Sequence, residues 1–269
     1  MVSTSVRLVA LDLDGTLVGE DLLLHPRVRE AVTRTRERGI AVVIVTGRMF
    51  AAARPFAQQL GISGPIVCYQ GAAIFDVQST AQLTCTPVRP DVTRDVLAWA
   101  RRTGVHAQCY QDDVLYVDEI NRFSRRYTEL ARVEAVLVTS LEDRFAQQPT
   151  VKIVLVDDPE RSAAHLEALR PLLAHRAYLT RSHVDFVEIL DPTVNKGAAL
   201  RWIAARSGVP MESTLAVGDA WNDTPMLEAA GFAVAMGSAP AELRAQADAV
   251  VADAAGAGVA EALERFVLA

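Results

Sequence analysis

Short runs rich in β-branched residues alternate with longer amphipathic stretches over both ends of the chain, and this alternation limits the possible folds most. The runs have the length and composition of buried strands and lie at 6–11, 40–45, 65–69, 214–217, 232–235 and 249–251. The helical stretches lie at 26–39, 49–60, 196–207, 225–230, 241–247 and 259–267. Strands that alternate with helices predict βαβ units, and therefore an α/β fold around a parallel sheet.

The middle of the chain, near residues 83–190, has a different pattern of expected helices and strands. It contains a helical stretch at 91–102, short alternating runs, a strand at 152–156, a helix from Pro159 and a strand at 185–190. We expect an α+β insertion at 83–190 between two halves, 1–82 and 191–269, of one α/β domain. The proline-containing segments 84–90 and 191–192 are plausible hinges.

Composition excludes several classes of protein. The chain has 269 residues, 51% of them hydrophobic and 22% charged, which is ordinary for a globular protein. A net charge of −6 gives no general attraction to nucleic acid or to an anionic membrane. The apolar stretch near the first residues is too short for a signal peptide, so we expect none, and no apolar run is long enough to cross a bilayer. We therefore expect a soluble, cytoplasmic protein with neither a nucleic-acid nor a membrane partner, as a monomer or small homo-oligomer.

Two residue types are scarce enough to be informative. The three cysteines, Cys68, Cys85 and Cys109, are odd in number and show no CxxC spacing, which favours a reducing compartment over a disulfide framework or a zinc site. Of the 27 basic residues, only Lys152 and Lys196 are lysine. Because arginine is used almost everywhere else in this chain, each lysine calls for an explanation. A lysine ammonium is a compact point charge, which the planar guanidinium of arginine cannot replace.

Asp12 and Asp14 stand two residues apart at the end of the first expected strand, in the sequence LDLDGTL. Period-two alternation would place both carboxylates on one side of the chain. At a separation of ~4 Å and an effective dielectric constant near 20, their repulsion would be about 4 kcal/mol, so the pair needs a cation. An ordinary strand end followed by an Asp-Gly turn is the alternative.

Two further motifs suit an anion. Thr46, Gly47 and Arg48 end the second expected strand and offer a hydroxyl, a backbone N–H and a guanidinium to a phosphate, although threonine and glycine end many strands. Lys196 opens a helix, where its charge opposes the helix dipole, so we expect its ammonium to face an anion. A solvated surface lysine is the alternative.

The last cluster, GDAWND, follows the strand at 214–217. Asp219 and Asp223 are four residues apart across a strand-to-helix turn, close enough to share a hard cation through oxygen ligands. Asp223 could instead cap the next helix, so Asp219 is the better candidate for a metal ligand.

In this order, the motifs DLDGTL, TGR, NKG and GDAWND resemble the four motifs of the haloacid dehalogenase (HAD) superfamily. The segment NDTPMLEAAGFAVAMGSA is especially similar to the Cof-type branch of its phosphatases. Only 32 residues separate Asp14 from Thr46, whereas 150 separate Thr46 from Lys196, which resembles members with an α/β cap domain after the second motif. The resemblance implies a HAD-like Rossmannoid core with a cap at 83–190.

The same resemblance implies a Mg²⁺-dependent phosphatase of small phosphorylated metabolites, most plausibly sugar phosphates. Asp12 would carry a transient aspartyl-phosphate and Asp14 would act as acid and base. Mg²⁺ would be held by Asp12, the backbone carbonyl of Asp14, Asp219 and, directly or indirectly, Asp223. The phosphate would be bound by Thr46, Gly47, Lys196 and Asn222.

Some features depart from the family pattern, and other functions remain open. Gln70 stands where relatives usually have asparagine, and Trp221 is bulkier than the residue expected in the metal loop. A phosphomutase that returns phosphate to its substrate would use the same motifs. A catalytically inactive module that binds phosphorylated metabolites is a further alternative.

Overall fold

The computed structural model describes residues 6–269, and these form two compact units. The core unit comprises the residues up to Gly47, Ala53–Leu83 and Asn195–Ala269. The inserted unit comprises Arg48–Ala52 and Thr84–Val194. Within the described residues, no helix combines the length and the apolar character needed to cross a membrane.

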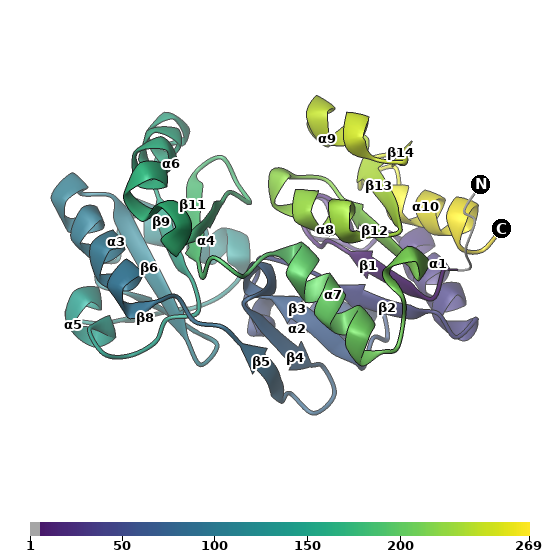
Figure 1. Cartoon of the computed structure of the whole chain (residues 1–269), viewed down its shortest axis with the longest axis horizontal. Helices are drawn as coiled ribbons and strands as arrows, with labels where there is room; N and C mark the ends of the chain where they lie inside the picture. The colour runs from purple at the N-terminus through teal and green to yellow at the C-terminus, as the bar shows by residue number, and fades with distance from the viewer. Residues whose placement is uncertain (1–5) are drawn as a thin grey trace. The chain divides into compact units, whose positions relative to one another are not determined.

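The core unit is built on a five-stranded parallel sheet with the order β14-β13-β12-β1-β2 (Figure 1). Its strands are β1 (Leu8–Leu11), β2 (Ala41–Ile44), β12 (Thr214–Gly218), β13 (Phe232–Met236) and β14 (Ala249–Val251). In register, Leu11 of β1 lies between Ile44 of β2 and Val217 of β12. The carboxyl ends of these neighbouring strands therefore meet at one edge of the sheet, as predicted for an α/β fold.

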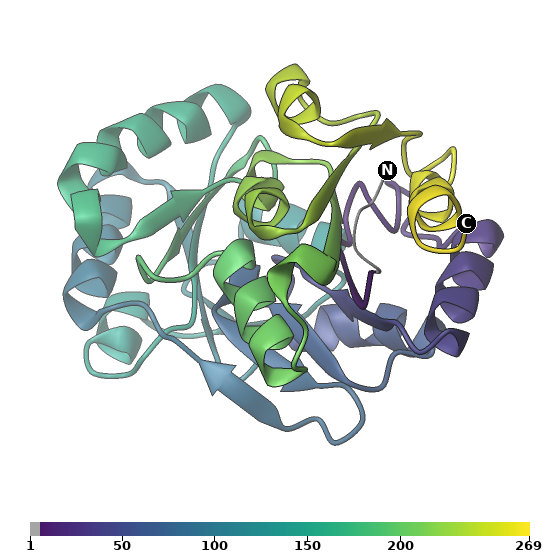
Figure 2. The ribbon, with the colours of Figure 1, turned by 45° about the vertical axis from the view of Figure 1, so that its right-hand side comes forward.

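Helices cover both faces of this sheet, which is why its central strands are apolar throughout. On one face, Ala199, Leu200 and Ile203 of α7 pack with strand residues such as Leu8 and Ala216. Figure 2 shows α1 and α10 together on the other face. The helices assigned to the core unit by most of their residues are α1 (Pro26–Glu37), α2 (Phe50–Gln59), α7 (Lys196–Arg206), α8 (Thr224–Ala229), α9 (Ala241–Gln246) and α10 (Gly258–Phe266).

The expected strand at 65–69 forms as β3 (Pro65–Cys68), but most of its pairing is antiparallel. It pairs with β4 (Ala73–Asp76), and β5 (Gln82–Cys85) completes this second sheet. A single parallel bridge between Val45 and Val67 connects β3 to the end of β2. A tight 3₁₀ turn, η1 (Tyr69–Gly71), joins β3 to β4 and places Gln70 beside the end of β2, where its backbone N–H donates to the carbonyl of Thr46.

The inserted unit contains a six-stranded sheet with the order β10-β11-β9-β6-β7-β8, in which all pairs except β7 with β8 are antiparallel. Apolar side chains on one face of this sheet pack with residues of α3, α5 and α6. The strands are β6 (His106–Gln111), β7 (Val114–Val117), β8 (Ala135–Leu137), β9 (Ile153–Val156), β10 (Tyr178–Thr180) and β11 (Phe186–Leu190). The helices are α3 (Pro90–Thr103), α4 (Arg122–Ala131), α5 (Leu141–Phe145) and α6 (Pro159–Leu173).

The close approach of α7 and α8 gives a test of the core packing. A Cβ on Gly197 would lie 2.0 Å from the carbonyl oxygen of Pro225, so Gly197→Ala should push the two helices apart. We expect a loss of about 1–3 kcal/mol in the free energy of unfolding, measured by urea denaturation. Gly64→Ala is the matched control, since no heavy atom lies within 4 Å of its added Cβ. Equal stability of the two variants would contradict the tight packing.

Candidate active site

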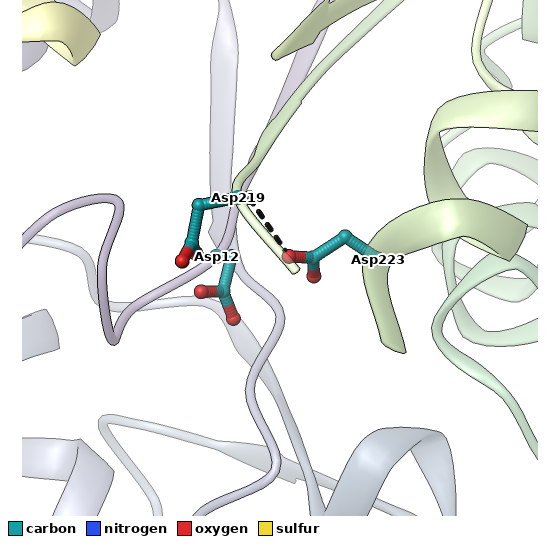
Figure 3. Close-up of side chains that lie close together, drawn as sticks. All are labelled: Asp12, Asp219 and Asp223. Carbon is teal, nitrogen blue, oxygen red and sulfur yellow. Dashed lines mark hydrogen bonds between the residues drawn. The ribbon is translucent and has the colours of Figure 1, made fainter. Parts of the chain in front are cut away.

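Three carboxylates gather at the carboxyl edge of the core sheet. Asp12 follows β1, Asp219 follows β12, and Asp223 ends the 3₁₀ turn η4 (Trp221–Asp223). One oxygen from each lies within 4.8 Å of the others (Figure 3). Residues far apart in the sequence meet here because β1 and β12 are parallel neighbours. The structure thus brings together three of the four acidic residues that the motifs predicted.

Lys196 lies at the centre of this cluster, as its position at the start of α7 predicted. Its Nζ donates to Oδ1 of Asp12 and to Oδ1 of Asp223, each at 2.5 Å, and the residue is 1% exposed. The side chain of Asn195 accepts a hydrogen bond from the backbone N–H of Ala198 and so begins the helix. The lysine is therefore a buried counter-ion and not a solvated surface residue.

Asp223 also shapes the loop that carries Asp219. Its Oδ2 accepts hydrogen bonds from the backbone N–H groups of Asp219 and Ala220, both at 3.0 Å. The alternative role as a side-chain cap of α8 is not realised, because no such hydrogen bond begins that helix. A Cβ on Gly218 would lie 2.6 Å from the Asp223 side chain, so the glycine is needed for this close approach.

Asp14 is not one of the three clustered carboxylates, but its charge is close enough to add to the rise in the pKa of Asp12. The strand ends at Leu11 and the chain turns at once, which leaves Asp14 exposed. Thr16 is instead the buried residue of this turn, and its hydroxyl donates to Oδ1 of Asp219 at 2.9 Å. Sequence reasoning missed Thr16, although its place in the DLDGTL motif was the available signal. Gly15 has a positive φ of 82° and a Cβ there would collide with Asp219.

Thr46 and Gly47, at the end of β2, lie beside two amide side chains. The Nδ2 of Asn222 donates to Oε1 of Gln70 at 3.1 Å, and both residues are buried. A Cβ on Gly47 would lie 2.3 Å from Nε2 of Gln70, so glycine makes room for this amide. The Oδ1 of Asn222 has no hydrogen-bond partner within residues 6–269, which is expected where a polar ligand binds.

Two further residues were singled out in the sequence, Arg48 and Trp221. Arg48 is part of the inserted unit, where its Nη1 donates to the carbonyl of Ala131 at 3.3 Å. Trp221 is 60% exposed, so its indole is not packed into the interior.

The electrostatics of the cluster call for a cation. Burial, followed by repulsion from Asp223, raises the pKa of Asp12 well above its usual value. The same two causes, in the same order, raise the pKa of Asp219 to about 6. Burial alone would lower the pKa of Lys196, but Asp12 and Asp223 outweigh it and raise that pKa. One ammonium cannot balance three carboxylates, and their oxygens are ligands suited to a hard divalent metal.

Metal binding should therefore stabilise the fold. A cation that binds only the native state at 100 times its Kd adds about 2.7 kcal/mol to the free energy of unfolding. We expect Mg²⁺ to raise the melting temperature after chelation with EDTA, and Asp219→Asn to lose most of that gain. Glu228→Gln, an exposed acid on α8, is the control that should keep it. A variant Asp219→Asn with the full gain would contradict this metal site.

The comparisons with known proteins agree with this geometry. The haloacid dehalogenase-like hydrolase family matches residues 9–263. Pyridoxal phosphate phosphatase YbhA from Escherichia coli is 32% identical over 260 residues, which cover 93% of this chain and 94% of that protein. The 5-amino-6-(5-phospho-D-ribitylamino)uracil phosphatase YitU from Bacillus subtilis is 29% identical, over 98% of this chain and 99% of its own.

The structural comparison gives the same family. A haloacid dehalogenase-like hydrolase from Bacteroides thetaiotaomicron superimposes with a TM-score of 0.87 and 26% identity, over 97% of this chain and 99% of its own. The expected α/β fold of the HAD type is confirmed. The chain belongs to the haloacid dehalogenase-like hydrolases and is a phosphoric monoester hydrolase.

Proposed function

We propose that this enzyme hydrolyses small phosphorylated metabolites, with sugar phosphates as the expected class, through a covalent aspartyl-phosphate on Asp12. The observation that carries the proposal is the buried contact of Lys196 with Asp12 and Asp223, inside a set of three carboxylates. The two relatives described above are named for small phosphorylated compounds, pyridoxal phosphate and a phosphorylated ribitylaminouracil.

Asp12 is the proposed nucleophile. One of its carboxylate oxygens forms a bond to phosphorus while the bond from phosphorus to the alcohol oxygen breaks. Asp14 gives a proton to the departing alcohol and then takes one from the water that hydrolyses the aspartyl-phosphate. The exposure of Asp14 supports this exchange of protons, because a group buried among the three carboxylates could not reach water.

Mg²⁺ is the proposed cofactor, held by Asp12, the backbone carbonyl of Asp14, Asp219 and, directly or indirectly, Asp223. When bound, it supplies positive charge to the carboxylates and to the phosphoryl oxygens. Thr16 supports this ligand set by holding the Asp219 side chain. Lys196 adds a fixed positive charge beside Asp12 and keeps two of the carboxylates in place before any cation binds.

The phosphoryl group is proposed to bind where the ends of β2 and β12 bring polar groups together. Thr46, Gly47, Lys196 and Asn222 would contact its oxygens, and the unpartnered Oδ1 of Asn222 marks a polar atom in need of a donor. Arg48 would also contact the phosphate, since the guanidinium has donors beyond the Nη1 that donates to the carbonyl of Ala131. Such positioning and charge stabilisation supply most of the rate in phosphoryl transfer.

The inserted segment, the cellular compartment and the oligomeric state complete the proposal. Residues 83–190 would act as a cap domain that excludes water during transfer to Asp12. The enzyme would work in the cytoplasm on free metabolites, as a monomer or small homo-oligomer. The three cysteines form no disulfide, which fits a reducing compartment.

Replacement of the nucleophile tests the mechanism. Asp12→Asn should lower Mg²⁺-dependent phosphate release from a panel of phosphorylated metabolites by at least about a thousandfold, because an amide cannot form the acyl-phosphate. Asp21→Asn, an exposed residue of the same loop, is the control. Activity retained in Asp12→Asn would exclude the covalent route. Isomerised substrate without free phosphate in the wild type would favour a mutase.

The buried ammonium gives a second test. Lys196→Arg keeps the charge, but a planar guanidinium cannot repeat two 2.5 Å contacts made by one nitrogen in a fully enclosed space. We expect kcat to fall by about a hundredfold or more, a magnitude typical for loss of a preorganised charge contact. Arg201→Lys, at an exposed position of α7, should remain within about twofold. Full activity of Lys196→Arg would contradict a specific requirement for lysine at this position.

A further inference from the structure

The turn η1 has a backbone conformation that its residues do not favour. Tyr69 and Gln70 have positive φ angles of 52° and 59°, in the left-handed region that residues other than glycine seldom adopt. Each of the two residues is only 1% exposed, so the turn is buried as well as strained. Backbone strain of this kind persists where the surrounding structure forces it, and it clusters at active sites. The strain therefore indicates that the position of a group in this turn matters.

The turn packs on the end of β2 and on the start of α7. The backbone N–H of Gln70 donates to the carbonyl of Thr46 at 3.0 Å. A Cβ on Gly71 would lie 2.6 Å from the carbonyl oxygen of Asn195, so the turn lies directly against the residue before Lys196. All five residues belong to the core unit. The turn thus supports two of the segments from which the phosphate-binding groups are proposed to come.

The side chain of Gln70 reaches a third such segment, the turn η4. Its Oε1 accepts a hydrogen bond from Nδ2 of Asn222 at 3.1 Å, and Asn222 is 5% exposed. Its Nε2 lies so close to Gly47 that an added Cβ there would be 2.3 Å away. One carboxamide therefore connects the end of β2 with the turn that follows β12.

This hydrogen bond fixes the orientation of the Asn222 carboxamide. The last torsion of an asparagine side chain has a broad, roughly two-fold preference, so contacts decide how the carboxamide faces. Gln70 holds the Nδ2 end, and Oδ1 has no hydrogen-bond partner among the described residues. Nδ2 carries two hydrogens, of which Gln70 accepts one. The second hydrogen can then be donated to a phosphoryl oxygen.

We propose that Gln70 is a positioning residue of the phosphate site, whose Oε1 holds the Asn222 carboxamide in the orientation that binds the phosphoryl group. The inference rests on the function proposed above. Gln70 acts through Asn222 and does not itself need to contact the substrate. A donor that is already oriented contributes to the rate, because it does not have to reorient when charge develops on the phosphoryl group.

The choice of glutamine at this position supports the proposal. Asparagine would suit the backbone better, because it adopts positive φ angles more readily than glutamine. With the same backbone, however, an asparagine carboxamide would end one methylene short of the present contact with Asn222. The longer side chain is therefore kept against the preference of the backbone, and its length is what the contact with Asn222 uses.

A double-mutant cycle tests whether Gln70 acts through Asn222. The four proteins are the wild type, Gln70→Met, Asn222→Ala and the double variant, and the readout is kcat/KM for p-nitrophenyl phosphate with Mg²⁺. Methionine keeps the length of the side chain but has no carboxamide oxygen. We expect Gln70→Met to lower kcat/KM by about tenfold in the wild type and by less than about twofold in Asn222→Ala.

A merely structural role would give a different result. Damage to the turn would lower kcat/KM by the same factor in both backgrounds, because that damage does not depend on Asn222. Equal factors would overturn the inference, and so would an unchanged kcat/KM in Gln70→Met. Gln78→Met, at an exposed position after β4, is the control and should stay within about twofold. A tenfold loss in this control would assign the effect to the sheet as a whole and overturn the inference.

Gln70→Asn is the second variant, since it suits the positive φ and should fold even where methionine does not. We expect its melting temperature to stay level while kcat/KM falls by about tenfold, and this fall should again be absent in Asn222→Ala. Full activity of Gln70→Asn would overturn the inference, because the length of the glutamine would then not matter.

Phosphate binding separates this inference from the proposed function. Inorganic phosphate is titrated calorimetrically, with Mg²⁺, into the four full-length proteins of the first cycle. We expect Gln70→Met to weaken phosphate binding by about tenfold in the wild type and by less than about twofold in Asn222→Ala. Equal weakening in both backgrounds would overturn the role of Gln70. Absence of phosphate release by the wild type would instead count against the proposed function, and the binding cycle would still decide the role of Gln70.

Discussion

The candidate active site depends on one interaction, the buried contact of the Lys196 ammonium with Asp12 and Asp223. Without a positive charge, three carboxylates at one edge of the sheet would repel each other in a medium of low dielectric constant. The lysine holds Asp12 and Asp223 in place, and Asp223 in turn holds the backbone of the loop that carries Asp219. The order of the whole loop thus follows from where one ammonium lies.

The sequence predicted the core sheet well because its strands are buried on both faces and read as continuous apolar runs. It failed where strands are short and accessible to solvent. β8, for example, has three residues of which none is buried, so no apolar run marks it. Helix α5 is only five residues long and shows too few turns for a periodic pattern. Helices and strands with a clear local pattern could be predicted from the sequence. Short elements such as β8 and α5 have no such pattern and form through contacts with residues far away in the sequence.

The candidate site was predictable to the extent that motif residues end neighbouring parallel strands. Asp12, Asp219, Asp223 and Lys196 meet as expected. Asp14 is exposed and lies outside the three-carboxylate cluster, although its charge still raises the pKa of Asp12. Thr16 and Gln70 acquire their contacts only in three dimensions, with partners about 200 and 150 residues away in the sequence. No spacing rule within one segment can reveal contacts of that range.

The carboxylates and the lysine all come from the core unit, and the inserted unit supplies none of them. The carboxylates and the ammonium of the candidate site therefore come from two outer stretches of the sequence, and the central stretch contributes none of them. Substitutions in that central stretch leave every member of the cluster around Lys196 unchanged in the sequence. In a chain with this layout, the inserted unit can change in sequence while all four residues of the cluster are kept.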